Sequence, residues 1–324
     1  MKVSFVIPAY NVEETIHSCL TSIINQVYES EFEIIVVDNK STDTTADILK
    51  SFKNIICITE ETPGRSHARN SGAKMAKGEY VAFIDADVVL DSFWLRDMLT
   101  HVTPFIAGIQ GNIIPKPSHH SSFLDNFRNY IYELRGTKKN LLKMNIWESP
   151  MINSASCMYR RDVFHNVGGF DSNLIRHEDI DLSKRVFLNG YDLLCSPALS
   201  YVYYDQNLWN YFKRSFEEGV TKISYHKKWK KFTYKNHPSG ALFTSAVIIK
   251  NSLFPILKGL ITFNIYAIFL GINNMTRFCG MLKGILSKRT ISTLTLQTKD
   301  ARIWDCDRIF MSYQAVESTL KVEE

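Results

Sequence analysis

Two aspartates one residue apart follow an apolar, strand-like run. The run covers residues 80–84, and Asp85 and Asp87 come directly after it. Because residues i and i+2 of an extended chain point the same way, both carboxylates can face one ligand. Two hard oxygen donors suit Mg²⁺ or Mn²⁺, with phosphate oxygens completing the coordination. The alternative is a pair of solvated turn aspartates, with Asp91 capping a helix predicted over residues 92–100.

A second acidic cluster, HEDID, opens the helix predicted over residues 178–188. Asp179, Leu182 and Val186 are spaced i, i+3 and i+7, so Asp179 shares the inward face of that helix. Asp181 lies on a different face, where it can pair with an arginine four residues later. An inward carboxylate at a helix start can act as a general base. Taken alone, however, the cluster is better explained by simple helix capping.

The stretch PGRSHARN begins a predicted helix with two arginines, Arg65 and Arg69. A helix N-terminus with arginine suits a diphosphate, although an ordinary amphipathic helix start is the alternative. The sequence contains neither GxGxxG nor GxxxxGK(S/T), so the dinucleotide and P-loop fingerprints are absent. The Gly-rich start of the sugar nucleotidyltransferases is also missing.

The composition indicates a globular chain with a sizeable core. The 324 residues are 45% hydrophobic with a net charge of +5, which suits one large domain or one and a half and excludes a disordered protein. The six cysteines include no CxxC pair, so zinc and redox motifs are unsupported. Cys19, Cys57 and Cys195 lie in apolar surroundings and are predicted to be core residues. The opening MKVSFVIPAY resembles no signal peptide, so we expect a reducing cytoplasm.

The elements that position these residues alternate between strands and helices. Continuous Val/Ile runs separated by helices indicate a mostly parallel sheet covered on both faces. We predict strands over residues 3–8, 33–38, 54–59 and 80–84, and helices over 13–27, 41–52, 64–77 (stopped by Gly78) and 92–100. Farther on we predict helices over 118–143, 162–167, 178–188 and 207–219, and strands over 151–159 and 191–195.

Open parallel sheets bind ligands beyond the carboxyl ends of their strands. That rule selects three polar segments of this chain, Pro8–Asn11, Asp38–Ser41 and Asp85–Asp87. We therefore expect these segments to converge on one ligand.

The C-terminal third changes character. Residues 212–235 are rich in lysine and arginine, a patch that suits phosphate or an anionic membrane surface, although a solvated face is at least as plausible. Residues 241–288 contain apolar runs, of which the longest uncharged one covers 259–275. A spanning helix needs about 20 mainly apolar residues. An interfacial or re-entrant hairpin is therefore favoured over a full span, with a buried helix pair as an equal alternative.

Taken in order, these stretches resemble glycosyltransferase family 2, the inverting nucleotide-sugar transferases of the GT-A fold. The matching stretches are FVIPAYNVEETIHSCLTSIINQ, EIIVVDNKSTDTT, PGRSHARNSGAKMAKGEYVAFIDAD and MYRRDVFHNVGGFDSNLIRHEDIDLSKRVFLNGY. They cover roughly residues 1–220, and four ordered motifs are far more specific together than any one alone.

The resemblance implies a GT-A (Rossmann-like) fold with a C-terminal helical, partly apolar extension, and it assigns the site. It places Pro8, Ala9 and Tyr10 in the nucleotide pocket, with Asp38 and Asn39 at the base and Arg69 on the nucleotide side. It assigns Asp85 and Asp87 to Mn²⁺ or Mg²⁺, with Asp87 as the direct ligand. It makes Asp179 the general base and places Glu178 beside the acceptor.

Two positions depart from the family pattern. Asn39 stands where a second Asp is common, and its side chain can still accept a hydrogen bond from a base N–H. Many members carry a His near the place of Tyr203-Tyr204-Asp205, where it assists metal or diphosphate binding. His226 or His237 can substitute, but no spacing supports either.

The resemblance implies transfer of a sugar from a nucleoside-diphosphate sugar, a UDP-sugar first, to the hydroxyl of a saccharide or lipid-linked acceptor. Metal and Arg69 neutralise the leaving diphosphate, and Asp179 removes the acceptor proton. We expect polysaccharide or glycolipid biosynthesis, with peripheral contact at the inner face of the cell membrane and no nucleic acid. The alternatives are a sugar nucleotidyltransferase, which releases pyrophosphate, and a membrane-docked binding protein of the same fold.

We expect a GT-A catalytic domain over residues 1–225, with its nucleotide-sugar half at about 1–110 and its acceptor half at about 111–225. A basic and apolar, helical, membrane-associating region follows over 226–290, and a polar tail over 291–324. Sugar and acceptor contacts are expected from variable loops between Ile109 and Trp147.

Overall fold

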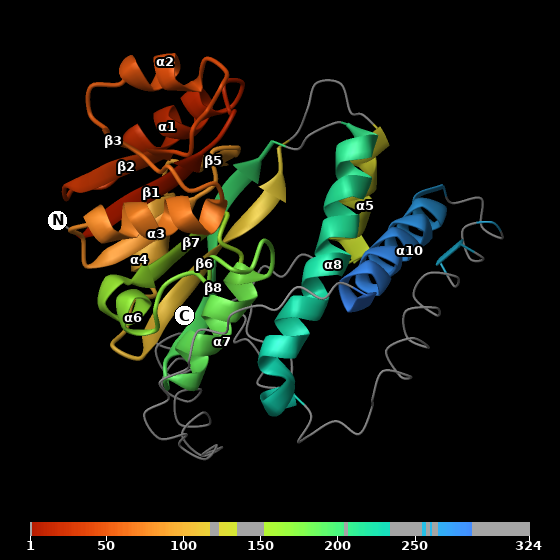
Figure 1. Cartoon of the computed structure of the whole chain (residues 1–324). Coiled ribbons are helices and arrows are strands. Elements are labelled where there is room, and N and C mark those ends of the chain that lie inside the picture. Colours follow the sequence, from red (N-terminus) through yellow and green to blue (C-terminus); the bar gives the residue numbers. More distant parts are fainter. Residues whose placement is uncertain are drawn as a thin grey trace, which may run out of the picture. The chain divides into compact units, whose positions relative to one another are not determined.

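The computed structural model describes residues 2–116, 123–134, 152–203, 207–233, 255–256, 260 and 265–286. At its centre is an 8-stranded sheet in the order β3-β2-β1-β4-β7-β6-β8-β5 (Figure 1). The strands are β1 (Val3–Ala9), β2 (Phe32–Asp38), β3 (Ile56–Thr59), β4 (Tyr80–Ile84), β5 (Val88–Leu90), β6 (Ile106–Pro115), β7 (Ser156–Arg160) and β8 (Asp192–Val202). The helices are α1 (Ile16–Ile24), α2 (Thr45–Lys50), α3 (Arg65–Met75), α4 (Trp94–Leu99), α5 (Phe123–Leu134), α6 (Arg161–Asn166), α7 (Glu178–Leu188), α8 (Leu208–Thr233) and α10 (Ile265–Leu286).

The half of the sheet built from the first hundred residues is parallel, as predicted. β1 pairs in parallel with β2 and with β4, and β2 pairs in parallel with β3. Both faces of this half are covered by helices, which explains why β1, β2 and β4 are continuous apolar runs. The other half is mixed, because β7 is antiparallel to both β4 and β6, while β8 is parallel to β6 and antiparallel to β5.

Two strands were not predicted from the sequence, the three-residue β5 and the ten-residue β6. β6 is the more important of the two. It overlaps the start of the segment assigned to variable loops between Ile109 and Trp147, so that part of the assignment is wrong. The sequence IAGIQGNIIP is interrupted by two glycines and two polar residues, which hides the strand pattern. Packing requires the glycines. A Cβ at Gly108 would lie 2.7 Å from the Tyr159 ring, and one at Gly111 would lie 2.6 Å from Trp94 Nε1.

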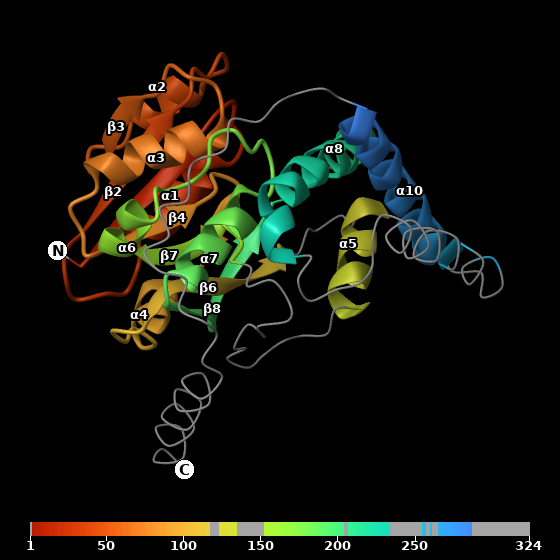
Figure 2. The ribbon, with the colours of Figure 1, turned by 60° about the horizontal axis from the view of Figure 1, so that its bottom comes forward.

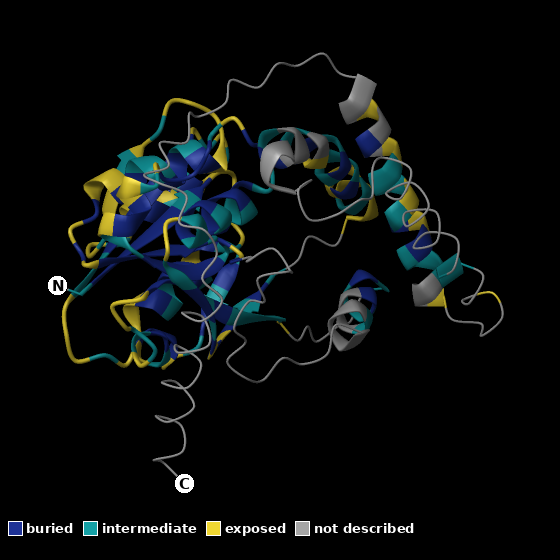
Figure 3. Cartoon of the chain, turned by 90° about the horizontal axis from the view of Figure 1, so that it is seen from below, coloured by how far each residue is buried: buried dark blue, intermediate teal, exposed yellow. Residues whose placement is uncertain are grey.

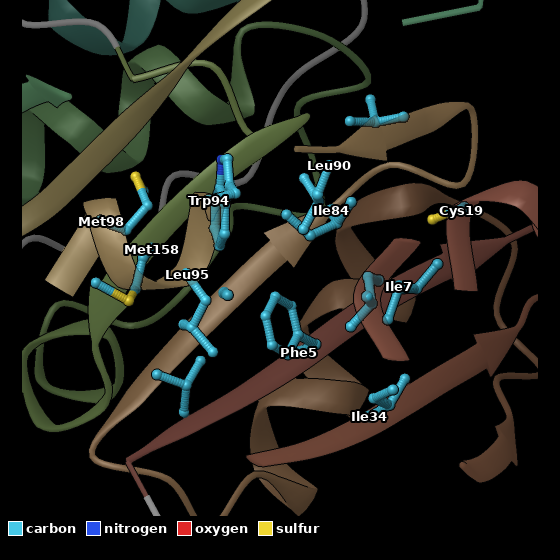
Figure 4. Close-up of a cluster of buried hydrophobic side chains, with 14 of the residues drawn as sticks. Phe5, Ile7, Cys19, Ile34, Ile84, Leu90, Trp94, Leu95, Met98 and Met158 are labelled. Carbon is cyan, nitrogen blue, oxygen red and sulfur yellow. The ribbon is translucent and has the colours of Figure 1, made fainter. Parts of the chain in front are cut away.

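Each face of the sheet carries its own buried layer. On one face Phe5 and Ile7 of β1 pack with Trp94 of α4 and neighbouring side chains (Figure 4). On the other face Val6 of β1 packs in a cluster with Phe83 and residues of α3, α6 and α7. Buried residues concentrate in the strands, while the exposed ones lie mainly on outer helix faces and loops (Figure 3). A strand buried on both faces has a rigid end, and the candidate site is built on such ends.

The predictions made for Gly78 and Cys57 are wrong. α3 ends at Met75 with an extended Ala76 rather than at a glycine cap. Gly78 is required for another reason, because a Cβ there would lie 2.7 Å from the backbone nitrogen of Ser4. Cys57 is exposed because β3 is the edge strand of the sheet and only one residue of it is even half-buried. Cys19 is buried as predicted.

Helices α8 and α10 pack against each other (Figure 2). A Cβ at Gly219 of α8 would meet the carbonyl group of Arg277 and lie 2.9 Å from the backbone nitrogen of Met281, both on α10. Residues 265–286 of the apolar region thus form one helix packed on α8, with Ile265, Ile272 and Met275 exposed; the choice between a hairpin and a buried helix pair stays a prediction. Most of the predicted hairpin, residues 241–264, lies outside the described residues. Over the parts of the chain that the structure describes, no helix has the length and apolarity needed to cross a membrane.

Gly219→Ala is expected to loosen α10 from α8. The added methyl group would press on backbone atoms, which cannot rotate away, and overpacking of this kind costs about 1–3 kcal/mol. The melting temperature should fall by several degrees and amide hydrogen exchange in residues 265–286 should accelerate. Lys213→Ala, at an exposed position of the same helix, serves as the control. Unchanged exchange in the glycine variant would contradict the close approach of the two helices.

Candidate active site

Three strand ends meet at one edge of the sheet, as predicted. β2, β1 and β4 are neighbours in that order, and Ala9 at the end of β1 pairs with Asp38 at the end of β2. Asp85 follows directly after β4, and its backbone nitrogen donates to Ala155 O at 3.0 Å. The segments that begin at Pro8, Asp38 and Asp85 are therefore adjacent.

Hydrogen bonds join the loops after β1 and β2 and fix their conformation. Asn11 Oδ1 accepts a hydrogen bond from Thr42 N at 2.8 Å, and Asp38 Oδ1 accepts one from Ser41 N at 3.0 Å. Asn11 and Lys40 have positive φ angles of 50° and 63°. Such angles cost about 1–3 kcal/mol each and persist only where the surroundings impose them. The loops thus form a preorganised rim.

Residues 8–10 differ in which of their atoms are accessible to a ligand at the end of β1. The methyl group of Ala9 is 1% exposed and belongs to the core, so only its backbone can face a ligand. Pro8 is half-buried. The ring of Tyr10 is 60% exposed at the strand end, where an aromatic face can stack on a base. Of the three residues assigned to the nucleotide pocket, Tyr10 offers the largest accessible surface.

Asn39 is a scaffold residue. Its Nδ2 donates to Glu60 O and to Thr62 O, both at 2.8 Å, and its Oδ1 accepts from Gly64 N at 2.7 Å. The side chain is buried, and both its amide hydrogens are used. The structure therefore gives Asn39 the task of holding the 60–64 segment that leads into α3, and the second lone pair of Oδ1 stays the predicted acceptor for a base N–H.

Arg69 joins the two acidic clusters. The guanidinium is 1% exposed, with Nη2 at 2.6 Å from Asp85 Oδ1 and Nη1 at 3.0 Å from Glu178 Oε1. It also lies 5.3 Å from the ring centroid of Phe170. Burial alone would lower the pKa of Arg69, but the two carboxylates outweigh it and the pKa is raised. Arg69 is thus a permanently charged bridge inside the protein.

Asp85 and Asp87 occupy a turn between β4 and β5. The turn is closed by a hydrogen bond from Val88 N to Asp85 O at 3.0 Å, so the argument from extended-chain geometry is wrong here. The two carboxylates nevertheless interact. Burial raises the pKa of Asp87 to about 6, the charge of Asp85 adds to that effect, and Arg214 and Arg65 oppose it. The turn holds two acids in a setting that favours a cation.

The two acids at the start of α7, Glu178 and Asp179, differ in burial and in the contacts they make. Glu178 is 3% exposed and bonded to Arg69. Asp179 is half-buried, and its Oδ1 accepts from Ile180 N at 2.8 Å. Burial raises the pKa of Asp179 to about 6, with the charge of Glu178 as the second cause. Asp181 pairs with Arg185 at 2.8 Å as predicted, although the pair is buried.

The residues present fit a divalent cation bound with few protein ligands. Within the described ranges, no group of three or more His, Cys, Asp or Glu side chains could hold a metal ion. Asp87 is an acid whose charge is opposed by burial and by a neighbouring acid. Two carboxylates plus diphosphate oxygens are a common arrangement for Mg²⁺ or Mn²⁺. His237, Tyr204, Asp205 and the side chain of His226 lie outside the described residues.

Sequence reasoning missed Phe170, Arg214 and Asp171 as parts of this region. Phe170 and Asp171 follow the double glycine of GGFD, inside one of the quoted motifs. An aromatic residue and an acid directly after two glycines were the available signal in the sequence; the structure gives both glycines positive φ and buries Phe170 and Asp171. In the sequence, Arg214 is one charge of the basic patch over residues 212–235, and its effect on Asp87 depends on how α8 packs.

Together, the fold and the site define a class of protein. A parallel half-sheet carries polar loops and an acidic turn at the carboxyl ends of its strands. A mixed half-sheet, continuous with it, supplies an acidic helix start. This is the GT-A arrangement of the nucleotide-sugar transferases.

Comparisons with known proteins agree with this class. Glycosyltransferase AglE of Haloferax volcanii is 31% identical over 213 residues, which are 60% of this chain and 67% of AglE. The poly(ribitol-phosphate) beta-glucosyltransferase of Bacillus spizizenii is 46% identical over 99 residues, 28% of this chain but only 16% of that protein. The mannosyltransferase PcManGT from Pyrobaculum calidifontis, solved with GDP-Man and Mn²⁺, has the same fold, with a TM-score of 0.64 at 16% identity over 89% of this chain and 88% of PcManGT.

The profile of glycosyl transferase family 2 matches residues 4–168, just over half of the 324 residues. The chain belongs to glycosyltransferase family 2. The match covers the whole parallel half of the sheet, the acidic turn and β7, and it ends before the acidic pair of α7.

Proposed function

We propose that this protein transfers a sugar from a nucleoside-diphosphate sugar to an acceptor hydroxyl, with inversion at the anomeric carbon. One observation carries the proposal. Buried Arg69 ties the acidic turn at the strand ends to the acidic pair of α7, at 2.6 Å from Asp85 and 3.0 Å from Glu178. That arrangement supports a cation site at Asp85 and Asp87 and a separate carboxylate, Asp179, as parts of one proposed active site.

The leaving group is the proposed task of the strand-end residues. Asp87 and Asp85 would hold Mn²⁺ or Mg²⁺, which when bound supplies positive charge to the departing diphosphate. Tyr10 and the loop fixed by Asp38 and Asn39 would hold the nucleoside. Electrostatic stabilisation where charge develops is commonly the largest contribution to this kind of catalysis.

The acceptor is the proposed task of Asp179. With a pKa of about 6, its carboxylate is ionised at neutral pH yet more basic than an ordinary aspartate, as a general base should be. It takes the proton of the acceptor hydroxyl. The oxygen then bonds to the anomeric carbon as the bond from that carbon to the diphosphate breaks on the opposite face. Buried Glu178, which is bonded to Arg69, would position Asp179 and the acceptor hydroxyl.

The donor and acceptor are proposed by class. A UDP-sugar is the first candidate, and a GDP-sugar is the alternative because PcManGT binds GDP-Man. The proposed acceptor is a saccharide or lipid-linked chain, in line with the poly(ribitol-phosphate) beta-glucosyltransferase among the relatives. The predicted domain boundary at residue 225 falls inside α8, whose Lys228 and Trp229 are buried against Asp171 and Asp181. We therefore propose that the catalytic domain extends to the end of α8 and that the chain beyond it, up to residue 290, contacts the cytoplasmic face of the cell membrane. Family membership favours transfer over the nucleotidyltransferase alternative.

A panel of UDP-, GDP- and dTDP-sugars, with and without Mn²⁺, tests the donor site by thermal shift. Ligand at about 100 times its Kd stabilises a protein by about 2.7 kcal/mol, so one nucleotide class should raise the melting temperature by several degrees. Asp87→Asn should lose the part of that shift that depends on Mn²⁺. Asp97→Asn, which removes an exposed carboxylate paired with Arg96, should keep it. The proposal fails if no nucleotide sugar shifts the wild-type melting temperature and no acceptor panel yields transfer.

A further inference from the structure

One face of α8 lies against the chain segment that carries the acidic pair of α7. The residues of this face are spaced by about one helical turn and contact residues 171–185; they are Glu217, Thr221, Tyr225, Lys228 and Trp229. At a rise of 1.5 Å per residue, the face extends over about 18 Å. The name docking face is used below for these five residues.

The docking face holds the residue directly before the acidic pair. His177 has left-handed backbone angles, φ 68° and ψ 14°, which residues other than glycine seldom adopt, although Asn, Asp and His do so more often than the rest. Its ring stacks on Tyr225 with centroids 5.8 Å apart and planes 26° apart. Its Nδ1 lies 3.4 Å from Thr221 Oγ1. Because α7 begins at the next residue, the turn at His177 sets the direction in which Glu178 and Asp179 leave the loop.

Ion pairs hold the docking face of α8 against the chain both before and after His177. Arg176 Nη2 lies 3.0 Å from Glu217 Oε2. Farther along α8, Lys228 Nζ lies 2.5 Å from Asp171 and 2.8 Å from Asp181, and all three side chains are at most 3% exposed.

Trp229 Nε1 donates to Asp181 Oδ1 at 2.9 Å, next to the ion pairs of Lys228. Buried charges of this kind are stable only while they are paired. α7 and α8 therefore have one favoured relative position.

We propose that α8 is the positioning element of the acidic pair and that His177 is its positioning residue. Neither touches the reacting atoms. They act by fixing where Asp179 stands relative to the acceptor, so the inference rests on the proposed function for the role of Asp179. The nucleoside side takes its contacts elsewhere, since Asp38 and Asn39 are held by the loops after β2 and β3. The acidic turn is linked to α7 through Arg69 and senses the charge of Arg214 on α8, and neither arginine belongs to the docking face. Loosening the docking face should therefore weaken transfer and leave donor binding intact.

Paired variants separate the backbone turn and the ring stack from general damage. His177→Val introduces a β-branched residue that resists positive φ, whereas His177→Asn tolerates it. Tyr225→Leu removes the stacked ring, whereas Tyr225→Phe keeps it. Lys213→Ala is the control on an exposed position of α8. Each protein is assayed for transfer from the donor that gives the largest thermal shift to a panel of alkyl glycosides, for donor Kd, and for amide hydrogen exchange over residues 176–188.

The valine and leucine variants should lose about 100-fold in kcat, the loss expected when a catalytic group moves by about 1 Å. Their donor Kd should stay within about twofold, and exchange should rise at the start of α7. The phenylalanine variant should keep most of the activity. The asparagine variant keeps the turn but loses the ring stack, so its kcat should lie between that of the wild type and that of His177→Val. Wild-type kcat and exchange in the valine and leucine variants would overturn the inference, and so would a parallel loss of donor binding. Transfer that survives Asp179→Asn would instead overturn the proposed function.

Discussion

Replacing Asp179 with asparagine is expected to abolish sugar transfer while the protein still folds and binds its donor. Asparagine keeps an oxygen that can accept the 2.8 Å hydrogen bond from Ile180 N, but it cannot take a proton. Loss of a general base costs about 10²–10⁴-fold in rate. Single-turnover transfer and donor Kd, measured on the same preparation, separate chemistry from binding. Transfer near the wild-type rate would remove Asp179 from the mechanism.

The same variant carries a stability signature that depends on pH. Burial and Glu178 raise the pKa of Asp179 from 3.8 to about 6 in the folded chain. The stability associated with the protonated carboxyl group is complete below about pH 4 and is lost as pH rises through 6. Asparagine has no charge to bury. Its melting temperature should match the wild type near pH 4 and exceed it by several degrees at pH 8. An equal difference at both values would show that Asp179 is not desolvated.

Replacing Arg69 with methionine is expected to produce the largest loss of stability of any single change at the site. Asp85 and Glu178 would lose their shared cation, and the side chain of Glu178 is only 4% exposed. Removing one partner from a buried ion pair costs about 3–5 kcal/mol. Chemical denaturation measures the free energy of unfolding. Arg96→Met, which breaks an exposed pair with Asp97, is the matched control and should cost at most about 1 kcal/mol.

A second substitution tests the cause of that loss. In Arg69→Met/Glu178→Gln the stranded carboxylate becomes a neutral amide of the same shape. If the charge left unpaired is the cause, the double variant should be more stable than Arg69→Met alone, with a coupling free energy of about 1–3 kcal/mol. Strict additivity would mean that Arg69 acts through packing on Phe170, whose ring centroid lies 5.3 Å away.

The parallel half of the fold could be predicted from sequence because its signals are local. Buried strands such as β1 and β2 are continuous apolar runs, and their order fixes which ends meet. β6 could not be predicted in this way, since Gly108 and Gly111 are there to admit side chains from Tyr159 and Trp94, far away in the chain. The length of α8 was underestimated for a related reason. Its second half is stabilised by buried pairs such as Lys228 with Asp171, whereas its sequence there reads as a charged surface.

The candidate site was also only partly predictable from the sequence. The acidic residue types and their places at strand and helix ends follow from the sequence. The partners do not, because a spacing cannot show that Asn39 uses its amide on residues 60–64 or that Arg69 reaches both Asp85 and Glu178. The left-handed turn at His177 was also not predicted, since histidine is enriched at positive φ but adopts it at only a small fraction of its positions.

The position of β4 in the sheet has a consequence for the protein during its synthesis. The strands β3, β2, β1 and β4 leave the ribosome first and can pair with one another, but the outer neighbour of β4 is β7, which begins at Ser156. Until then the apolar run YVAFI stands at an open edge, able to pair with another nascent chain. Of the two ion-pair partners of Arg69, Asp85 is synthesised soon after it, whereas Glu178 is synthesised much later. A ribosome pausing between these points would hold an incomplete, association-prone intermediate, so smooth elongation across residues 85–178 should matter more to the yield of this protein than elongation elsewhere.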